Sequence, residues 1–208
     1  MRLKKTKSLT HKNAATTERA DFEENDFTGP LPIELLRSPS IRFLRLYDNQ
    51  FTGAIPTTVG LMSSLEKLEL SSNALGGTLP TELFSLPNLS LLTVDRCGMS
   101  GTLSEDFVKL NMTMRDLVLS NNGFTGPIPQ AFDQLTILSK CFFLWRVSSL
   151  CLLLTHLQPI SDTLILHGNA LTGIISATLC AEKGDFFNDL RNLTAPILVS
   201  CTCCNLQQ

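Results

Sequence analysis

The strongest constraint on the fold of this chain is a motif that returns about every 24 residues. One copy is LELSSNALGGTLP, in which Leu68 and Leu70 alternate and Asn73, Gly77 and Pro80 follow. The asparagine position of the motif falls at residues 25, 49, 73, 97, 122 and 169, so the spacings are 24, 24, 24, 25 and 47. A fixed period of this length predicts a solenoid of stacked coils.

Each position of the motif has a physical role. The Leu-x-Leu pair has a period of two, which predicts a short strand that directs both leucines inward. The chain then turns, and a buried asparagine can satisfy the backbone groups that lose their partners there. Glycine permits the bend, and proline, which lacks an N–H, suits a connecting segment on the outer side. Stacked coils would form a ladder of these side chains, in which an unsatisfied member costs about 1–3 kcal/mol. The predicted ladder residues are Asn25, Asn49, Asn73, Cys97, Asn122 and Asn169.

These units resemble the leucine-rich repeat family, in particular the plant-type class of receptor-like proteins and receptor kinase ectodomains, with L-x-x-L-x-L-x-x-N-x-L-x-G-x-I-P repeats. The resemblance covers residues 20–179 and about six recognisable units. It implies an α/β solenoid, a right-handed curved stack with parallel strands on the concave face. Short helical, 3-10 or extended segments would lie on the convex face. The family tolerates cysteine at the asparagine position, so we interpret Cys97 as a structural thiol.

Residues 139–161 interrupt the period, and their removal restores both the leucine pattern and the spacing. Three explanations are open. The segment could be a degenerate repeat, with Cys141 at a leucine site and Arg146 at the asparagine site. It could be a true insertion, or a sequence-level artefact such as a retained intron, which we favour. Its apolar run of fourteen residues contains Arg146 and is too short for a membrane span.

The two ends of the chain differ from the repeats. Residues 1–19 are predicted to be a basic flexible tail, without the apolar segment of a secretory signal. Residues 180–208 are predicted to be a cysteine-rich C-terminal cap over the last apolar layer. Disulfides are expected among its four cysteines, with three possible pairings; a zinc site is the alternative, although C-x-C-C lacks the usual ligand spacing. The cysteines are Cys180, Cys201, Cys203 and Cys204.

The evidence on the compartment points in two directions. Asn88, Asn111 and Asn192 begin N-x-S/T sequences and are candidate glycosylation sites. Together with paired cysteines and the extracellular type of repeat, they predict an extracellular or cell-surface protein. The missing signal peptide argues against this, and we interpret it as an incomplete N-terminus. Membrane attachment is expected only through a segment absent from this chain.

The sequence has no set of residues that predicts catalysis. The patterns G-x-x-x-x-G-K-S/T, H-E-x-x-H and G-x-S-x-G do not occur in it. We therefore expect a protein that is not an enzyme and has neither a cofactor nor a metal ion. The formal charge of −2 gives no global positive field that would attract nucleic acid.

The residues that alternate with the leucines would form columns on the concave face, on a rigid backbone. We expect this face to bind a protein, peptide or glycan, because tyrosine and arginine often dominate interface energetics. The candidate binding residues are Arg45, Tyr47, Lys67, Glu69, Thr93, Asp95 and Ser120. Two other functions remain open: inhibition of a secreted glycan-degrading enzyme, and a structural surface or wall scaffold without a discrete ligand.

Overall fold

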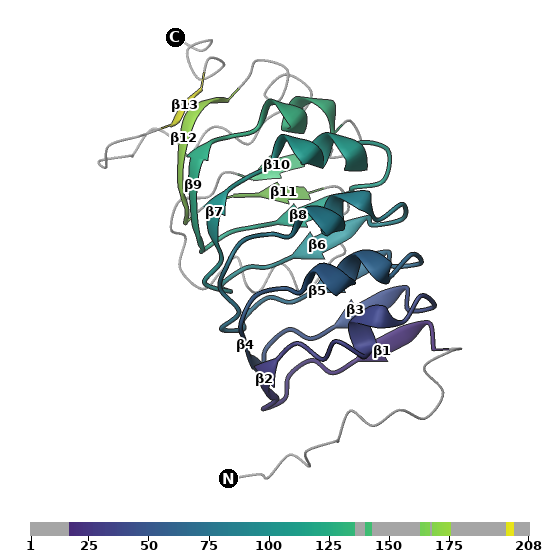
Figure 1. Cartoon of the computed structure of the whole chain (residues 1–208). Helices are drawn as coiled ribbons and strands as arrows, with labels where there is room; N and C mark the ends of the chain where they lie inside the picture. Colours follow the sequence, from purple (N-terminus) through teal and green to yellow (C-terminus); the bar gives the residue numbers. More distant parts are fainter. Residues whose placement is uncertain (1–16, 136–139, 143–162, 167, 176–198, 202–208) are drawn as a thin grey trace.

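The computed structural model describes residues 17–135, 140–142, 163–166, 168–175 and 199–201. These residues form a stack of similar coils, drawn from purple to green in Figure 1. Each complete coil has a strand on one side, a 3-10 helix opposite it and an extended segment at the edge between them. The predicted solenoid with parallel strands is confirmed.

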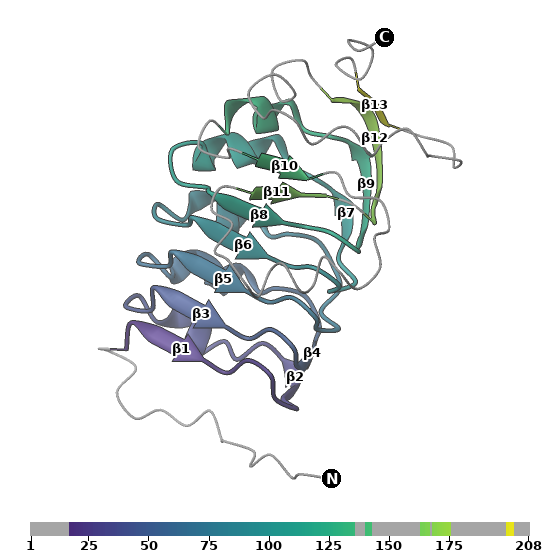
Figure 2. The same ribbon diagram turned by 180° about the vertical axis from the view of Figure 1, so that it is seen from behind.

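One side of the stack is a seven-stranded parallel sheet, here called the inner sheet, with the order β1-β3-β5-β6-β8-β11-β10. Figure 2 shows its strands side by side. Their bounds are β1 (Arg19–Asp21), β3 (Phe43–Arg45), β5 (Lys67–Glu69), β6 (Leu91–Thr93), β8 (Asp116–Val118), β11 (Thr163–Ile165) and β10 (Lys140–Phe142). In β3, β5 and β6 the central leucine is fully buried and its two neighbours are half-buried. The period of two therefore directs one column of leucines into the core and leaves the flanking residues on the inner face.

Extended segments along one edge of the stack form the outer strands, which are again parallel. Their bounds are β2 (Thr28–Pro30), β4 (Gln50–Thr52), β7 (Ser100–Thr102), β9 (Gly123–Pro127), β12 (Ala170–Ile175) and β13 (Val199–Cys201). Strand β2 pairs with β4, and the other four form one sheet in the order β13-β12-β9-β7. Apart from β13, each of these strands contains the Φ or the Gly position of the Asn-x-Φ-x-Gly part of the motif, where Φ is an apolar residue, and the Asn position precedes the strand.

Short 3-10 helices cover the side opposite the inner sheet. Their bounds are η1 (Leu35–Arg37), η2 (Thr57–Leu61), η3 (Thr81–Ser85), η4 (Glu105–Leu110) and η5 (Gln130–Gln134). The motif proline is the residue before η2, η3 and η5, with φ of −69°, −70° and −59°. Proline restricts φ to this range and lacks the N–H that the first helical turn would leave unpaired, so it favours a helix start at this point.

The core is one continuous apolar layer between the inner sheet and the 3-10 helices. Phe84, Phe107 and Phe132 come from successive helices and meet edge to face, with ring centroids 4.6 and 5.0 Å apart. Such aromatic pairs contribute about 0.5–1.5 kcal/mol each beyond the burial of their area. The aromatic column therefore links the coils on the helical side, as the leucine column does on the sheet side.

The strand order shows how the stack continues past the interruption at residues 139–161. Strand β11 pairs directly with β8, with Leu164 opposite Leu117, so the stack continues from one side of the interruption to the other. Strand β10 lies outside β11, with Cys141 opposite Leu164. A degenerate repeat would place its strand between β8 and β11, so that interpretation is wrong. The other residues of 139–161 lie outside the described part of the chain.

Several predicted features at the chain ends also lie outside the described residues. They are residues 1–16 of the basic tail, Cys180, Cys203, Cys204, Asn192 and all of the predicted cap except β13. The predicted boundary of the tail needs a correction, because Arg19 is already the first residue of β1. It is held there because β1 pairs in register with β3.

Candidate binding surface

A ladder of side-chain amides fixes the backbone that carries the inner face. Asn49 Nδ2 donates to the carbonyl of Leu46 in its own coil at 3.1 Å and to Phe22 of the previous coil at 2.9 Å. Its Oδ1 accepts the N–H of Phe27 at 3.1 Å. Asn73 repeats this arrangement one coil later, and Asn25 bonds to carbonyls of its own coil. The predicted side-chain contacts between coils are therefore present.

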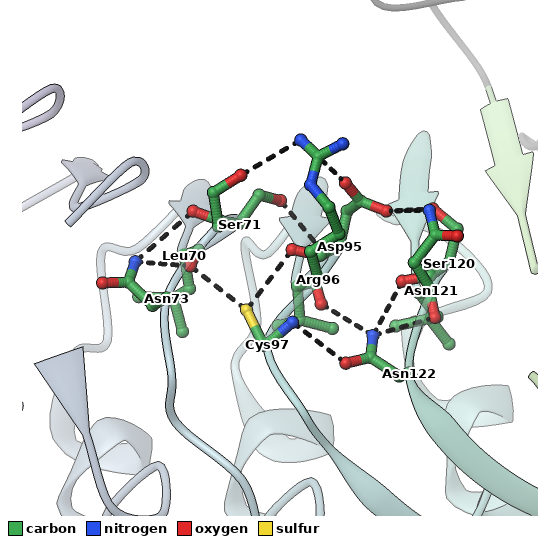
Figure 3. Close-up of polar contacts among 12 residues, drawn as sticks. Leu70, Ser71, Asn73, Asp95, Arg96, Cys97, Ser120, Asn121 and Asn122 are labelled. Atoms are coloured by element: carbon green, nitrogen blue, oxygen red, sulfur yellow. Dashed lines mark hydrogen bonds and ion pairs between the residues drawn. The ribbon is translucent and has the colours of Figure 1, made fainter. Parts of the chain in front are cut away.

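The ladder continues through a cysteine and across the interruption. The Cys97 thiol donates to the Leu70 carbonyl at 3.2 Å, while its backbone N–H donates to Asn122 Oδ1 at 3.1 Å (Figure 3). Burial raises the pKa of this thiol to about 12, so it is neutral in the folded protein. Asn169 takes the next place, where its Oδ1 accepts the N–H of Phe124 at 3.1 Å.

Two rows of alternating charge cross the first three coils at the inner sheet, one on the strands and one at the residues just before them. Arg45 Nε lies 3.0 Å from Glu69 Oε1, and Arg45 Nη1 lies 3.8 Å from Asp21 Oδ1. The register of β1, β3 and β5 sets these three residues side by side. Burial acts to lower the pKa of Arg45, but the hydrogen bond and charge of Glu69, together with the charges of Asp21 and Glu23, outweigh it and hold that pKa above its usual value.

The second row was missed by the sequence analysis. Arg42 forms ion pairs with Glu66 at 2.7 Å and with Glu18 at 3.2 Å. The signal was present in the sequence, because Glu18, Arg42 and Glu66 are spaced by one period of 24 residues. Lys67 faces the same side beside this row, half-buried and without an ion-pair partner among the described residues.

Tyr47 follows β3 and is half-buried next to the charged rows. Burial raises the pKa of its hydroxyl above the usual value, and the charges of Glu23 and Glu69 raise it further. Arg45 acts in the opposite direction with a smaller effect. The predicted residues Arg45, Tyr47, Lys67 and Glu69 therefore form one surface, here called the charged face.

Asp95 belongs to a separate network one coil further on. Its Oδ1 accepts from the Ser120 hydroxyl and from Asn121 Nδ2, both at 2.7 Å, and its Oδ2 lies 3.2 Å from Arg96 Nη2 (Figure 3). Ser120 is only 2% exposed. Its prediction as a contact residue is wrong, because its hydroxyl is used internally to hold Asp95. Thr93 is half-buried and lies opposite Glu69 in register.

The remaining predicted residues lie away from the inner face. Asn88 is exposed between η3 and β6, and its Nδ2 donates to the Ser63 carbonyl at 3.0 Å. Asn111 is half-buried at the C-terminal end of η4. Cys201 ends β13 and pairs in register with Ile175. Within the described part of the chain, no group of three His, Cys, Asp or Glu side chains could hold a metal ion.

No helix among the described residues is both long enough and apolar enough to cross a bilayer. The interrupted segment, considered above as a membrane span, lies outside those residues except for β10.

Comparison with known proteins agrees with this geometry. The family model described as Leucine Rich Repeat matches residues 64–86 and 113–135. These two stretches include the asparagines at 73 and 122 and the 3-10 helices η3 and η5. A search of curated protein sequences gives no match.

Solved structures with the same fold include two plant receptors and an ice-binding protein. The receptor kinase ectodomain GASSHO1/SCHENGEN3 from Arabidopsis thaliana, in complex with Casparian strip integrity factor 2, is 23% identical with a TM-score of 0.63, covering 88% of this chain and 18% of that one. The plant peptide hormone receptor RGFR1, in complex with RGF2, is 27% identical with a TM-score of 0.59. The match covers 74% of this chain and 25% of that one. A plant ice-binding protein is 23% identical with a TM-score of 0.59, and the match covers 76% of this chain and 51% of that one.

This chain spans a quarter or less of the two receptor ectodomains and about half of the ice-binding protein. The repeat motif, the asparagine ladder, the matched family model and the shared solenoid lead to the same assignment. The chain contains leucine-rich repeats and has the solenoid fold of leucine-rich repeat proteins.

Proposed function

We propose that this chain is a non-catalytic recognition module that binds a peptide or protein on the charged face of its inner sheet. The observation that carries the proposal is the arrangement of Arg45, Tyr47, Lys67 and Glu69. These side chains project from two neighbouring coils whose backbones are fixed by the ladder. A rigid surface loses little entropy on binding, and arginine and tyrosine are frequent interface anchors.

Similarity to peptide receptors supports the same choice of ligand class. RGFR1, at 27% identity, is described as a peptide hormone receptor in complex with RGF2. A glycan would require polar groups arranged around stacking aromatics, whereas Tyr47 is the one tyrosine of the sequence and carries acidic neighbours. Inhibition of a glycan-degrading enzyme and a scaffold role remain the alternatives.

The proposal can be tested with a displayed library of random peptides selected on the immobilised chain. Selected peptides should lose binding to a variant with Arg45→Ala, Tyr47→Ala and Glu69→Ala. Replacing both members of the ion pair avoids leaving either charge alone. The matched control carries three exposed outer-strand changes, Gln50→Ala, Ser100→Ala and Thr125→Ala, and should bind as the parent does. Equal binding to both variants would exclude the charged face.

We also propose an extracellular or cell-surface setting, with a glycan on Asn88. Support comes from the exposure of that side chain on a connecting segment, away from the inner face. Expression through a eukaryotic secretory pathway, followed by peptide mass spectrometry, tests this. The same digest under non-reducing conditions would reveal whether Cys180, Cys201, Cys203 and Cys204 are paired. An unmodified Asn88 and free thiols in the secreted chain would contradict this setting.

A second candidate function, ice binding, is favoured by the outer strands. The exposed positions of β2, β4, β7 and β9 are all uncharged. They include Thr52, Ser100, Thr102 and Thr125, and Thr102 lies opposite Thr125 in register. Parallel strands hold such residues about 4.8 Å apart. Methyl and hydroxyl groups held rigidly at this spacing suit an ordered solid surface better than a flexible peptide.

Ice recrystallisation assays separate the two candidates. If the outer strands bind ice, the parent chain should inhibit crystal growth, and Thr102→Lys with Thr125→Lys should abolish inhibition. The charged-face variant should inhibit normally. Absence of inhibition by the parent chain would dismiss this candidate and leave peptide recognition unaffected.

A further inference from the structure

The two arginines of the inner face are already neutralised in the free protein. Arg45 lies between Glu69 and Asp21, and Arg42 lies between two further glutamates. These ion pairs join the first three coils, so the fold itself holds them. A carboxylate of a ligand would have to displace a resident carboxylate before it could reach either guanidinium group. Neither arginine is therefore free to receive an anionic ligand.

The Glu23 carboxylate takes no part in these ion pairs, and one of its oxygens lacks a hydrogen-bond partner in the described part of the chain. Its Oε2 atom is buried and has no hydrogen-bond partner among the described residues. A carboxylate oxygen that has lost water without gaining a donor is costly to the folded state. The side chain as a whole is only half-buried. A change of side-chain rotamer can therefore bring this oxygen to the surface, where a donor from a ligand would replace the missing hydrogen bond.

Tyr47 occupies the position beside Glu23 in the next coil. Glu23 follows Asp21 by two residues, Tyr47 follows Arg45 by two, and Asp21 and Arg45 are register partners. The N–H of Glu24 donates to the Tyr47 carbonyl at 3.0 Å, which fixes the two backbones at this point. One coil further on, the same position holds the neutral Ser71.

The charges around the Tyr47 ring are predominantly negative. Burial raises the pKa of the hydroxyl, the carboxylates of Glu23, Glu69 and Glu24 add to that increase, and only Arg45 opposes them. Glu69 and Arg45 are engaged with each other. Glu23 forms no ion pair among the described residues, so its negative charge beside the ring attracts a cation.

We infer that the group that binds on Tyr47 is a lysine or arginine side chain of a basic peptide, held by the ring face and by the Glu23 carboxylate. This inference rests on the proposed peptide recognition by the charged face and specifies its ligand. An aromatic face attracts a cation through its quadrupole, and a carboxylate accepts charge-assisted hydrogen bonds from the same cation. The two interactions act together because Tyr47 and Glu23 lie in neighbouring coils, each two residues after its strand.

The test uses peptides selected on the full chain from the same displayed library. We expect them to be enriched in lysine and arginine over the unselected library and to bind less tightly as salt increases. Glu23→Gln and Tyr47→Ala should each weaken binding about tenfold, whereas Tyr47→Phe, which keeps the ring, should stay within about twofold. Glu34→Gln is the matched control, since it removes an exposed glutamate before η1, on the other side of the stack.

The outcomes distinguish the inference from the proposed function. If the triple charged-face variant loses binding but the peptides are not enriched in basic residues, peptide recognition stands and the cation inference is overturned. The inference is also overturned if Glu23→Gln binds as tightly as Glu34→Gln. If the triple variant binds like its parent, or no peptide is selected, both the inference and the proposed function fail.

Discussion

Replacing Asn73 with alanine should destabilise the chain by about 2–5 kcal/mol, and this value follows from the hydrogen-bond partners that Asn73 shares with other residues of the ladder. Asn73 is 7% exposed, and its amide reaches the carbonyls of Leu46 and Leu70 and the N–H of Phe51. The Leu46 carbonyl also accepts from Asn49, and the Leu70 carbonyl also accepts from the Cys97 thiol.

Both carbonyls therefore keep one donor after the substitution, and the Phe51 N–H alone loses the acceptor provided by Asn73 Oδ1. The loss of one donor should cost about 0.5–1 kcal/mol of folding free energy at each carbonyl, and the loss of the acceptor should cost about 1–3 kcal/mol at the Phe51 N–H. Asn73→Cys tests this division, because a thiol restores a donor to the carbonyls but no amide oxygen for Phe51. We expect it to recover less than half of the lost stability.

Guanidinium unfolding monitored by circular dichroism measures the total change in the free energy of unfolding. The control is Thr52→Ala on the exposed outer strand, which should unfold within about 0.5 kcal/mol of the parent. Because repeat proteins can unfold in parts, amide hydrogen exchange supplies a local measurement. The Phe51 amide should lose more protection than any neighbouring amide. A total below about 1 kcal/mol, or unchanged protection at Phe51, would refute the ladder argument.

Three further predictions concern other positions. Since the pKa of Cys97 is raised to about 12, the unfolded thiol ionises first, and stability should fall as pH rises above about 9; Cys97→Ser should lack this decline in denaturation midpoints at pH 8.5–10.5. Glu105→Gln should cost about 1 kcal/mol in thermal unfolding, because its carboxylate accepts the first two backbone N–H groups of η5 at 3.0 and 2.8 Å; an unchanged midpoint would contradict this. Gly101→Ala should destabilise by about 1–3 kcal/mol in urea unfolding, since φ is +87° and the new Cβ would lie 2.8 Å from a threonine methyl; Ser100→Ala, beside it and exposed, is the control.

The ladder could be predicted from sequence because every partner in it lies at a fixed offset from an asparagine. Asn49 and Asn73 bond to carbonyls three residues earlier and 27 residues earlier, and both offsets follow from the motif and its period. The same reasoning correctly joined the units on either side of the interruption. It did not place β10, because that strand carries too little of the motif to mark its position in the sheet.

The use of polar side chains on the surface could not be predicted in the same way. Ser120 stands at an outward position of the motif, yet its hydroxyl is buried against Asp95. Nothing in the alternation of strand residues distinguishes a serine that faces solvent from one that supports a neighbour. The difference arises from the size and charge of the side chain one coil away, since Asp95 attracts donors from the following coil.

The availability of a polar side chain on the inner face therefore depends on the residue one period away, in the neighbouring coil. Residues one period apart become lateral neighbours, so a series that alternates in sign neutralises itself, as Asp21, Arg45 and Glu69 do. Residue type alone would select Arg45 as the main binding residue, but its charge is already matched within the fold. The groups left for a ligand are those whose neighbours one period away do not complement them. Glu23 and Tyr47 form such a pair, and for that reason we place the ligand cation between them rather than a ligand anion on Arg45.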